Sequence, residues 1–154
     1  QCVFSVVGEV RFRRCVSGET LGSDDGFIRK LKEKIPRLKE EFNVKNCNVI
    51  LVFCPVVSRS GTNIEAALKK LQTLSETKPA VLVVLHHTLN PEILVPDSSR
   101  SVNRENTLTV DCLFEQDRGL LQCQKNQEAL DKITGWINPL VFTLSFICIL
   151  FFYI

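Results

Sequence analysis

Two uncharged stretches decide the fold: VILVFC, residues 49–54, and AVLVVL, residues 80–85. Each is continuously apolar, rich in valine, isoleucine and leucine, and adjoins a proline, Pro55 in the first case and Pro79 in the second. Strands that are buried on both faces have this composition, which is typical of a parallel sheet covered by helices. The sequence therefore predicts two central, parallel strands.

Two further strands are expected beside this pair. Residues 2–7 form a third apolar run, and residues 108–114 form a fourth that Thr109 and Asp111 interrupt. Polar residues are tolerated better where a strand is only partly covered, so residues 108–114 are predicted to form an edge strand.

Apolar residues at helical spacing lie between the expected strands. A first helix is predicted over residues 27–42, after two aspartates that can cap its first turn, and Pro36 must kink or restart it. Two more helices are expected over residues 62–74 and 126–137. Alternating strands and helices predict an α/β fold, with a doubly wound, mainly parallel sheet of about four strands and flanking helices.

Two segments do not fit this alternation. Residues 8–19 contain three arginines, and they are either a hairpin extension of the first strand or a loop insertion. Residues 86–106 contain two prolines and little periodicity, and this stretch is longer than most structural connections. We expect residues 86–106 to be a lid, a binding loop or a flexible segment.

The C-terminal segment Ile137–Ile154 carries no charged residue. As a helix it would span about 27 Å, close to the ~30 Å hydrocarbon core of a bilayer. Asn138 and Pro139 mark the joint at which the preceding domain should end. We expect a single transmembrane helix, in preference to a buried core helix or a lipid-anchor signal.

Residues 1–136 are then expected to form one domain. No signal peptide precedes it, so the span reads as a tail anchor and the domain is predicted to lie on the cytosolic face of a membrane. The seven cysteines are an odd number, one of them inside the span, which favours reduced thiols over a disulfide framework. A net charge of +2 excludes an acidic tail protein and a strongly cationic nucleic-acid binder.

The candidate ligand-binding residues follow the ends of the expected strands, which is the edge at which open α/β sheets bind ligands. The segment between the strand over 49–54 and the helix over 62–74 combines hydroxyls, a glycine and an arginine, which suit an anion. No phosphate-loop or dinucleotide motif is present, and neither a metal nor a cofactor is predicted. The candidates are Thr20, Gly22, Ser58, Ser60, Gly61, Thr62 and His86.

Glu65 has two possible roles. Thr62 and Glu65 have the spacing of a capping box, in which each side chain bonds the backbone of the other residue, and this structural role is preferred. The alternative makes Glu65 a nucleophile or an acid/base group beside a nucleoside. His86 is likewise either a ligand contact or an ordinary residue at the end of a strand.

The first helix is basic, with glutamates interleaved among its six lysines and arginines. A solvated helix face is the usual meaning of this pattern, and apposition to anionic lipid is an alternative. Nucleic-acid binding is not expected, because residues 29–39, which carry the basic side chains, include no aromatic residue on which bases could stack. The basic residues are Arg29, Lys30, Lys32, Lys34, Arg37 and Lys39.

Two resemblances bear on function. The segments over 50–53, 61–65 and 78–81 resemble the centre of nucleoside 2-deoxyribosyltransferase-like proteins, in which a glycine, a small residue and a nucleophilic glutamate follow a buried strand. That resemblance implies a nucleotide- or nucleoside-binding enzyme that acts on N-glycosidic bonds, with Glu65 as its weak candidate nucleophile. Across residues 3–136 the chain also resembles a group of small, uncharacterised proteins of bony fish, which implies no activity.

The loop before Glu65 carries no carboxylate to complete such a catalytic set. The function that we expect first is therefore a tail-anchored binding or signalling module, attached to the membrane through Ile137–Ile154. Its partner would be a protein or a nucleotide-type ligand, and the glycosidic enzyme is the alternative.

Overall fold

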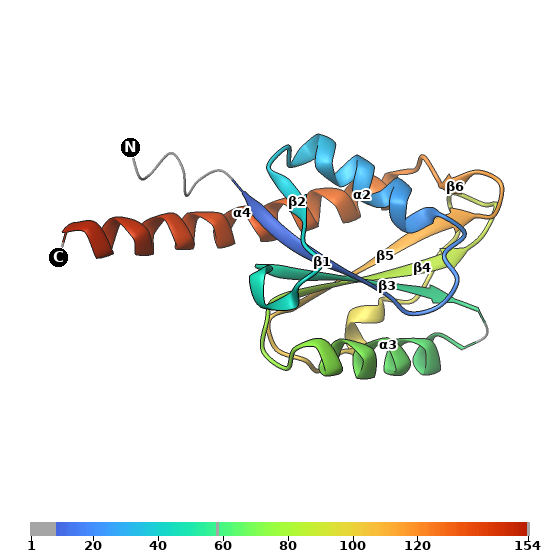
Figure 1. Cartoon of the computed structure of the whole chain (residues 1–154). Coiled ribbons are helices and arrows are strands. Elements are labelled where there is room, and N and C mark those ends of the chain that lie inside the picture. The colour runs from blue at the N-terminus through green and yellow to red at the C-terminus, as the bar shows by residue number, and fades with distance from the viewer. Residues whose placement is uncertain (1–8, 58, 154) are drawn as a thin grey trace.

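The structure, a computed structural model, describes residues 9–57 and 59–153, and their side chains as far as residue 138. Within these residues the chain is a mixed α/β domain built on one sheet of six strands. Helices cover both faces of the sheet (Figure 1).

The strands lie in the order β2-β1-β3-β4-β5-β6, and only β6 runs antiparallel to its neighbour. Because β2 and β3 lie on opposite sides of β1, the order reverses between β1 and β3. The elements are β1 (Val10–Val16), α2 (Ser23–Lys34), β2 (Leu38–Glu40), η1 (Val44–Asn46), β3 (Val49–Val56), α3 (Ser60–Leu74), β4 (Ala80–His87), η2 (Ser98–Ser101), β5 (Thr107–Glu115), β6 (Gly119–Leu120) and α4 (Gln124–Tyr153).

Alternate residues of the central strands point to opposite faces of the sheet and contribute to two separate hydrophobic cores. On one face Phe12 and Phe53 pack beneath α2 and α4, and the ring of Phe53 meets Phe27 edge to face at 5.7 Å. On the other face Val52 and Leu82 pack beneath α3 and η2. The continuous apolar runs thus arise because β3 and β4 are covered on both sides, as the sequence predicts.

The first described strand, β1, comes from the segment over 8–19. The expectation of a hairpin extension or an insertion there is wrong, since Val10–Val16 pairs in parallel with both β2 and β3. The strand expected over residues 2–7 lies outside the described residues.

The first helix is shorter than expected. It ends at Lys34, just before Pro36, and the chain does not restart as a helix but forms the short strand β2. Leu38, which fits the helical spacing, is instead buried as a strand residue beside Val10. The strand expected over 108–114 is confirmed, and only the two residues of β6 lie beyond it in the described part of the chain.

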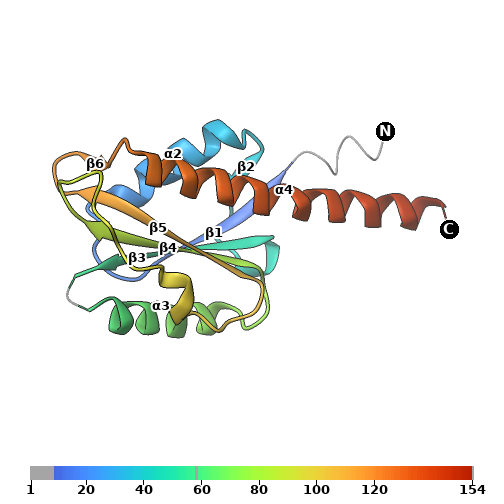
Figure 2. The same ribbon diagram turned by 180° about the vertical axis from the view of Figure 1, so that it is seen from behind.

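Helix α4 begins near the carboxyl edge of the sheet and continues without a break through residue 139, so the expected joint does not interrupt the helix. Its first half packs on the sheet beside α2, where Lys34 pairs with Asp131 at 2.7 Å. Its second half extends past the sheet on the side where β1 begins (Figures 1 and 2). In the part of the chain with described side chains, no helix is both long and apolar enough to span a bilayer, and most of Ile137–Ile154 lies outside that part.

Candidate functional site

The carboxyl ends of β1, β3 and β4 meet at one edge of the sheet. The candidate residues predicted from the sequence lie at the ends of these strands, in the loops that follow them or in the first turn of α3, and the strand order reverses between β1 and β3. Such a reversal point is where open α/β sheets usually bind ligands. The geometry of this carboxyl edge therefore decides what the candidates can do.

The loop after β1 is in close contact with the last residues of β3. Gly18 has a φ of +123°, and a Cβ atom at this position would lie 3.0 Å from Cγ of Pro55. The amide of Ser17 also donates to the carbonyl of Phe53 at 2.9 Å, which extends the β1–β3 pairing into the loop. Glycine is required at position 18, both for its backbone angle and for this close approach.

Thr20 and Gly22 lead into α2. Gly22 is the N-cap residue of the helix and has a φ of 83°, which favours glycine. Thr20 is buried, and its hydroxyl donates to a carboxylate oxygen of Asp24 at 2.6 Å. Thr20 therefore has a structural partner of its own.

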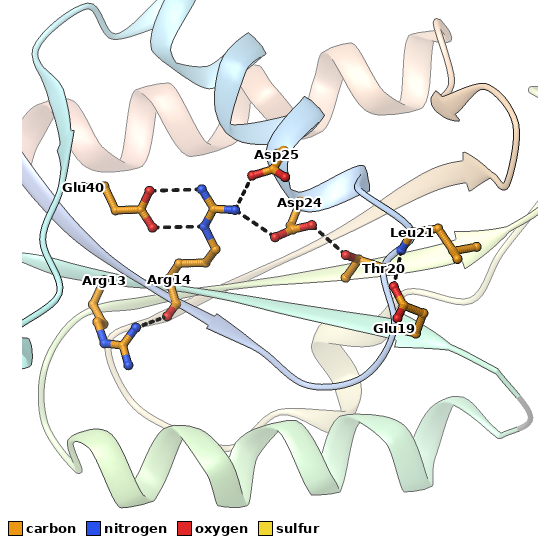
Figure 3. Close-up of polar contacts among 8 residues, drawn as sticks. All are labelled: Arg13, Arg14, Glu19, Thr20, Leu21, Asp24, Asp25 and Glu40. Atoms are coloured by element: carbon orange, nitrogen blue, oxygen red, sulfur yellow. Dashed lines mark hydrogen bonds and ion pairs between the residues drawn. The ribbon is translucent and has the colours of Figure 1, made fainter.

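Asp24 belongs to a larger set of charged residues centred on Arg14, which we call the Arg14 network (Figure 3). The guanidinium of Arg14 forms two bonds of 3.0 Å with Glu40 of β2. Its Nη1 also donates to Asp24 at 2.9 Å and to Asp25 at 2.5 Å, both in the first turn of α2. One arginine thus joins β1, β2 and α2.

These contacts shift the pKa values of Arg14 and Asp24. Burial alone would lower the pKa of Arg14, but its hydrogen bonds to Asp25, Glu40 and Asp24 outweigh burial, and the pKa is raised. Burial alone would raise the pKa of Asp24, but hydrogen bonds from Thr20 and Arg14 lower it. Both shifts favour the charged forms of Arg14 and Asp24, which suits a structural ion pair better than an acid/base group.

The start of α3 lies on the opposite face of the sheet from α2. Ser60 is the first residue of the helix, so Thr62 lies inside the first turn and the proposed capping box with Glu65 is not formed. The side chain of Asn63 instead accepts a hydrogen bond from the amide of Val57 at 3.2 Å. Ser60, Gly61, Thr62 and Glu65 are all exposed, and Ser58 lies outside the described residues.

His86, near the end of β4, is held by a second polar group, the Asp111 cluster. Nε2 of His86 lies 2.7 Å from Oδ1 of Asp111, and both side chains are almost buried. Ser98 of η2 donates to the same carboxylate through its hydroxyl at 2.5 Å and through its amide at 3.1 Å. Burial alone would raise the pKa of Asp111, but hydrogen bonds from His86 and Ser98 lower it.

The Asp111 cluster explains the long connection between β4 and β5. One carboxylate anchors η2, which lies in the middle of that connection, and η2 then covers the sheet beside α3. His86 thus contributes to the anchoring of a loop.

The predicted candidates fall into two groups. Thr20 and Gly22 lie on the face covered by α2, whereas Ser60, Thr62 and His86 lie on the face covered by α3 and η2. They share the carboxyl edge, but the sheet separates the two groups. The sequence thus predicts the edge correctly without showing that these residues point to different faces.

A cleft on the α2 face of the carboxyl edge includes one predicted residue, Gly22, and several that were not predicted as site residues. It has a volume of about 710 Å³ and lies between α2, the loop after β4 and β6. Its charged lining residues are Arg29, Lys30, Glu33 and Arg118. We call it the basic cleft. The sequence does not predict this cleft, because lysines that alternate with glutamates are equally typical of a solvated helix face.

The carboxyl edge also exposes apolar side chains. Among the described residues, six large apolar side chains are exposed, and five of them lie in loops that follow β1, β3 and β4. Exposed apolar residues gathered in one region are typical of interaction surfaces. These five are Leu21, Val57, Leu89, Ile93 and Leu94.

Comparisons with known proteins add no relatives. No protein-family model matches the chain, and no curated protein is significantly similar to it.

Proposed function

We propose that the chain is a single-pass, tail-anchored membrane protein whose cytosolic α/β domain acts as a binding or signalling module. Residues 1–136 are the module, and Ile137–Ile154 are the anchor. The observation that carries the proposal is helix α4, which packs on the sheet with its first half and runs on as one helix into a segment without charge.

Aromatic residues near the ends of the uncharged segment support the anchor. Trp136 directly precedes it and Tyr153 is the penultimate residue of the sequence. Tryptophan and tyrosine are enriched at both interfaces of a bilayer, where their rings reach the headgroup level. As a helix, the stretch between them would span about 25 Å, which is close to the hydrocarbon thickness of a bilayer.

The direction of α4 sets the orientation that we propose. The helix leaves the domain on the side where β1 begins (Figure 1), so the amino edge of the sheet faces the membrane. The carboxyl edge, with its exposed apolar residues and the basic cleft, then faces the cytosol. This supports partner binding at the carboxyl edge.

A protease-protection assay on sealed microsomes tests the anchor and its orientation. We expect the domain to be digested by external protease and the chain to resist extraction with alkaline carbonate. Phe146→Arg should release the chain, because arginine near the centre of a span costs about 2.5–3.5 kcal/mol of insertion free energy. Phe146→Leu is the matched control. A protected domain, or a Phe146→Arg variant that stays in the membrane, would contradict the proposal.

An enzyme acting on N-glycosidic bonds is the second candidate. The observation in its favour is that Glu65 is exposed and does not serve in the expected capping box, so its carboxylate is available. Glu65→Gln should abolish nucleoside turnover without lowering the melting temperature. Turnover that persists in this variant would eliminate Glu65 as nucleophile.

A further inference from the structure

The basic cleft has walls from three separate parts of the chain. Gly26, Arg29 and Lys30 come from α2, Leu89 from the loop after β4, and Arg118 from the turn between β5 and β6. The helical residues recur at intervals of three and four, so they occupy one side of α2. The cleft is therefore built by tertiary packing and is not a feature of one helix end.

Glycines keep the cleft open. Gly26 lies on its α2 wall, where an added Cβ would meet only Arg29 at 3.9 Å. Gly22 and Gly119 also line it, with φ values of 83° and 71°, and a Cβ at either position would have no neighbour within 4 Å. Space beside these backbone segments is available to a ligand.

The cleft carries excess positive charge. Arg29, Lys30 and Arg118 face a single lining carboxylate, Glu33, which leaves a formal balance of +2. Among the described residues, the side chains of these three cations form no ion pair. Unlike Arg14, they are free to contact an anion.

The two aspartates at the start of α2 do not cancel this charge. Asp24 and Asp25 do not line the cleft, and both bond the guanidinium of Arg14. The helix therefore presents these two aspartates to β1 and β2, and Arg29 and Lys30 to the cleft.

We propose that the basic cleft binds a soluble small molecule that carries a phosphate dianion, either as a phosphomonoester or as a pyrophosphate. Two arginines supply planar, forked donors that match phosphate oxygens, and the lysine adds a point charge. Leu89, Pro91 and Leu121 give an apolar wall for the rest of the molecule. The volume of about 710 Å³ lies in the range of small-molecule sites.

A soluble ligand fits better than a phosphoinositide headgroup. The proposal rests on the proposed function for this point, because α4 leaves the domain at the amino edge and the cleft lies at the carboxyl edge. Gln122, on the cleft wall, lies just before α4, and the stretch of that helix from Gln124 to Ile137 rises by roughly 20 Å. A headgroup in the same membrane would have to bridge that distance.

Binding of inorganic pyrophosphate and of ADP to the full chain in phosphatidylcholine nanodiscs tests the proposal. We expect both to bind by isothermal titration calorimetry, and affinity to fall with added salt. Replacing both arginines, Arg29→Ala with Arg118→Ala, should weaken binding at least about tenfold, because each charge-assisted hydrogen bond contributes substantially. Lys69→Ala, an exposed lysine of α3, is the matched control and should bind as the wild type does.

Glu33→Gln provides a readout that a purely structural role would not give. Removal of the one lining carboxylate should tighten pyrophosphate binding several-fold, since like charges then no longer oppose the ligand. Circular dichroism should show native helix content in every variant, because the substituted side chains are exposed.

Three results would overturn the proposal. They are absence of binding at millimolar pyrophosphate and ADP, unchanged affinity in the double arginine variant, and displacement of pyrophosphate by phosphatidylinositol 4-phosphate in the same disc. Failure of the membrane anchor is distinguishable, because the protein would then elute without discs. Failure of this proposal would instead leave disc-bound protein that binds no phosphate.

Discussion

The Arg14 network and the Asp111 cluster lie on opposite faces of one sheet and stabilise different parts of the fold. In the network, one cation is shared by three carboxylates, and it ties two strands to a helix. In the cluster, one carboxylate is shared by a histidine and a serine, and it holds a long connection in place. The network therefore supports the packing of the domain, whereas the cluster supports one loop.

The largest effect is expected from Arg14→Met, which leaves Asp24 and Glu40 without their cation. We expect a loss of about 3 kcal/mol in the free energy of unfolding, because breaking these partly buried pairs leaves carboxylates without a cation at sites of limited solvent access. Urea denaturation followed by circular dichroism measures it.

Two controls sharpen that result. Arg11→Met removes an exposed arginine of the same strand, and it should cost less than about 0.5 kcal/mol. Lowering the pH to about 4 should recover part of the loss in Arg14→Met, because protonation removes the unpaired carboxylate charges. An equal loss in Arg14→Met and Arg11→Met would show that the Arg14 network contributes no more to stability than an exposed ion pair.

A smaller and more local effect is expected from Asp111→Ala. Loss of the acceptor shared by Ser98 and His86 should cost about 2 kcal/mol. Hydrogen exchange should rise chiefly over residues 88–102, since η2 loses its anchor. Uniformly faster exchange throughout the sheet would contradict the view that this cluster holds one loop.

Thr20→Val should cost about 1 kcal/mol, the usual worth of one hydrogen bond, since it removes the buried bond to Asp24. Thr20→Ser keeps the hydroxyl and should recover most of that stability. Thermal denaturation of both variants gives the measurement. Equal losses in the two would assign the effect to packing of the threonine methyl group.

The smallest effect concerns acid stability. The pKa of Asp111 is lowered in the folded chain, so its stabilising contribution is present above its ordinary pKa and is lost as pH falls through the folded value. Asp111→Asn removes that titration. The free energy of unfolding of this variant should therefore fall less steeply than that of the wild type below about pH 4. If the free energy of unfolding falls equally steeply with pH in the variant and in the wild type, Asp111 is not among the groups that cause the loss of stability in acid.

The two clusters also show why part of the fold could not be predicted. Residues 49–54 and 80–85 need no partner to be recognised as strands, because apolarity on both faces is a local property. In β1, Val10 and Phe12 alternate with arginines as expected of a strand, but Arg14 occupies an inward position and breaks the pattern. Its burial depends on Glu40, 26 residues away, which no local pattern reveals.

The candidate site is a similar case. The carboxyl edge followed from the strand pattern, since parallel strands end together. The face of the sheet on which each candidate lies could not be predicted, because it depends on which helix packs above each loop. In the sequence Asp111 only interrupts an apolar run, whereas in the structure its carboxylate is the partner of Ser98 and His86. The charges of the basic cleft come from α2 and from Arg118, nearly ninety residues later, so proximity could not be inferred.

The unbroken course of α4 has a rotational consequence. Successive residues of a helix are turned by about 100° and raised by about 1.5 Å. Deleting one residue between Ile133 and Pro139 would therefore swing the sheet by about 100° around the axis of the tail, while changing its height very little. Deleting four residues would return the sheet to within about 40° of its original orientation and bring it about one helical turn closer to the end of the tail. The phase of this helix, rather than its length, sets which way the carboxyl edge points.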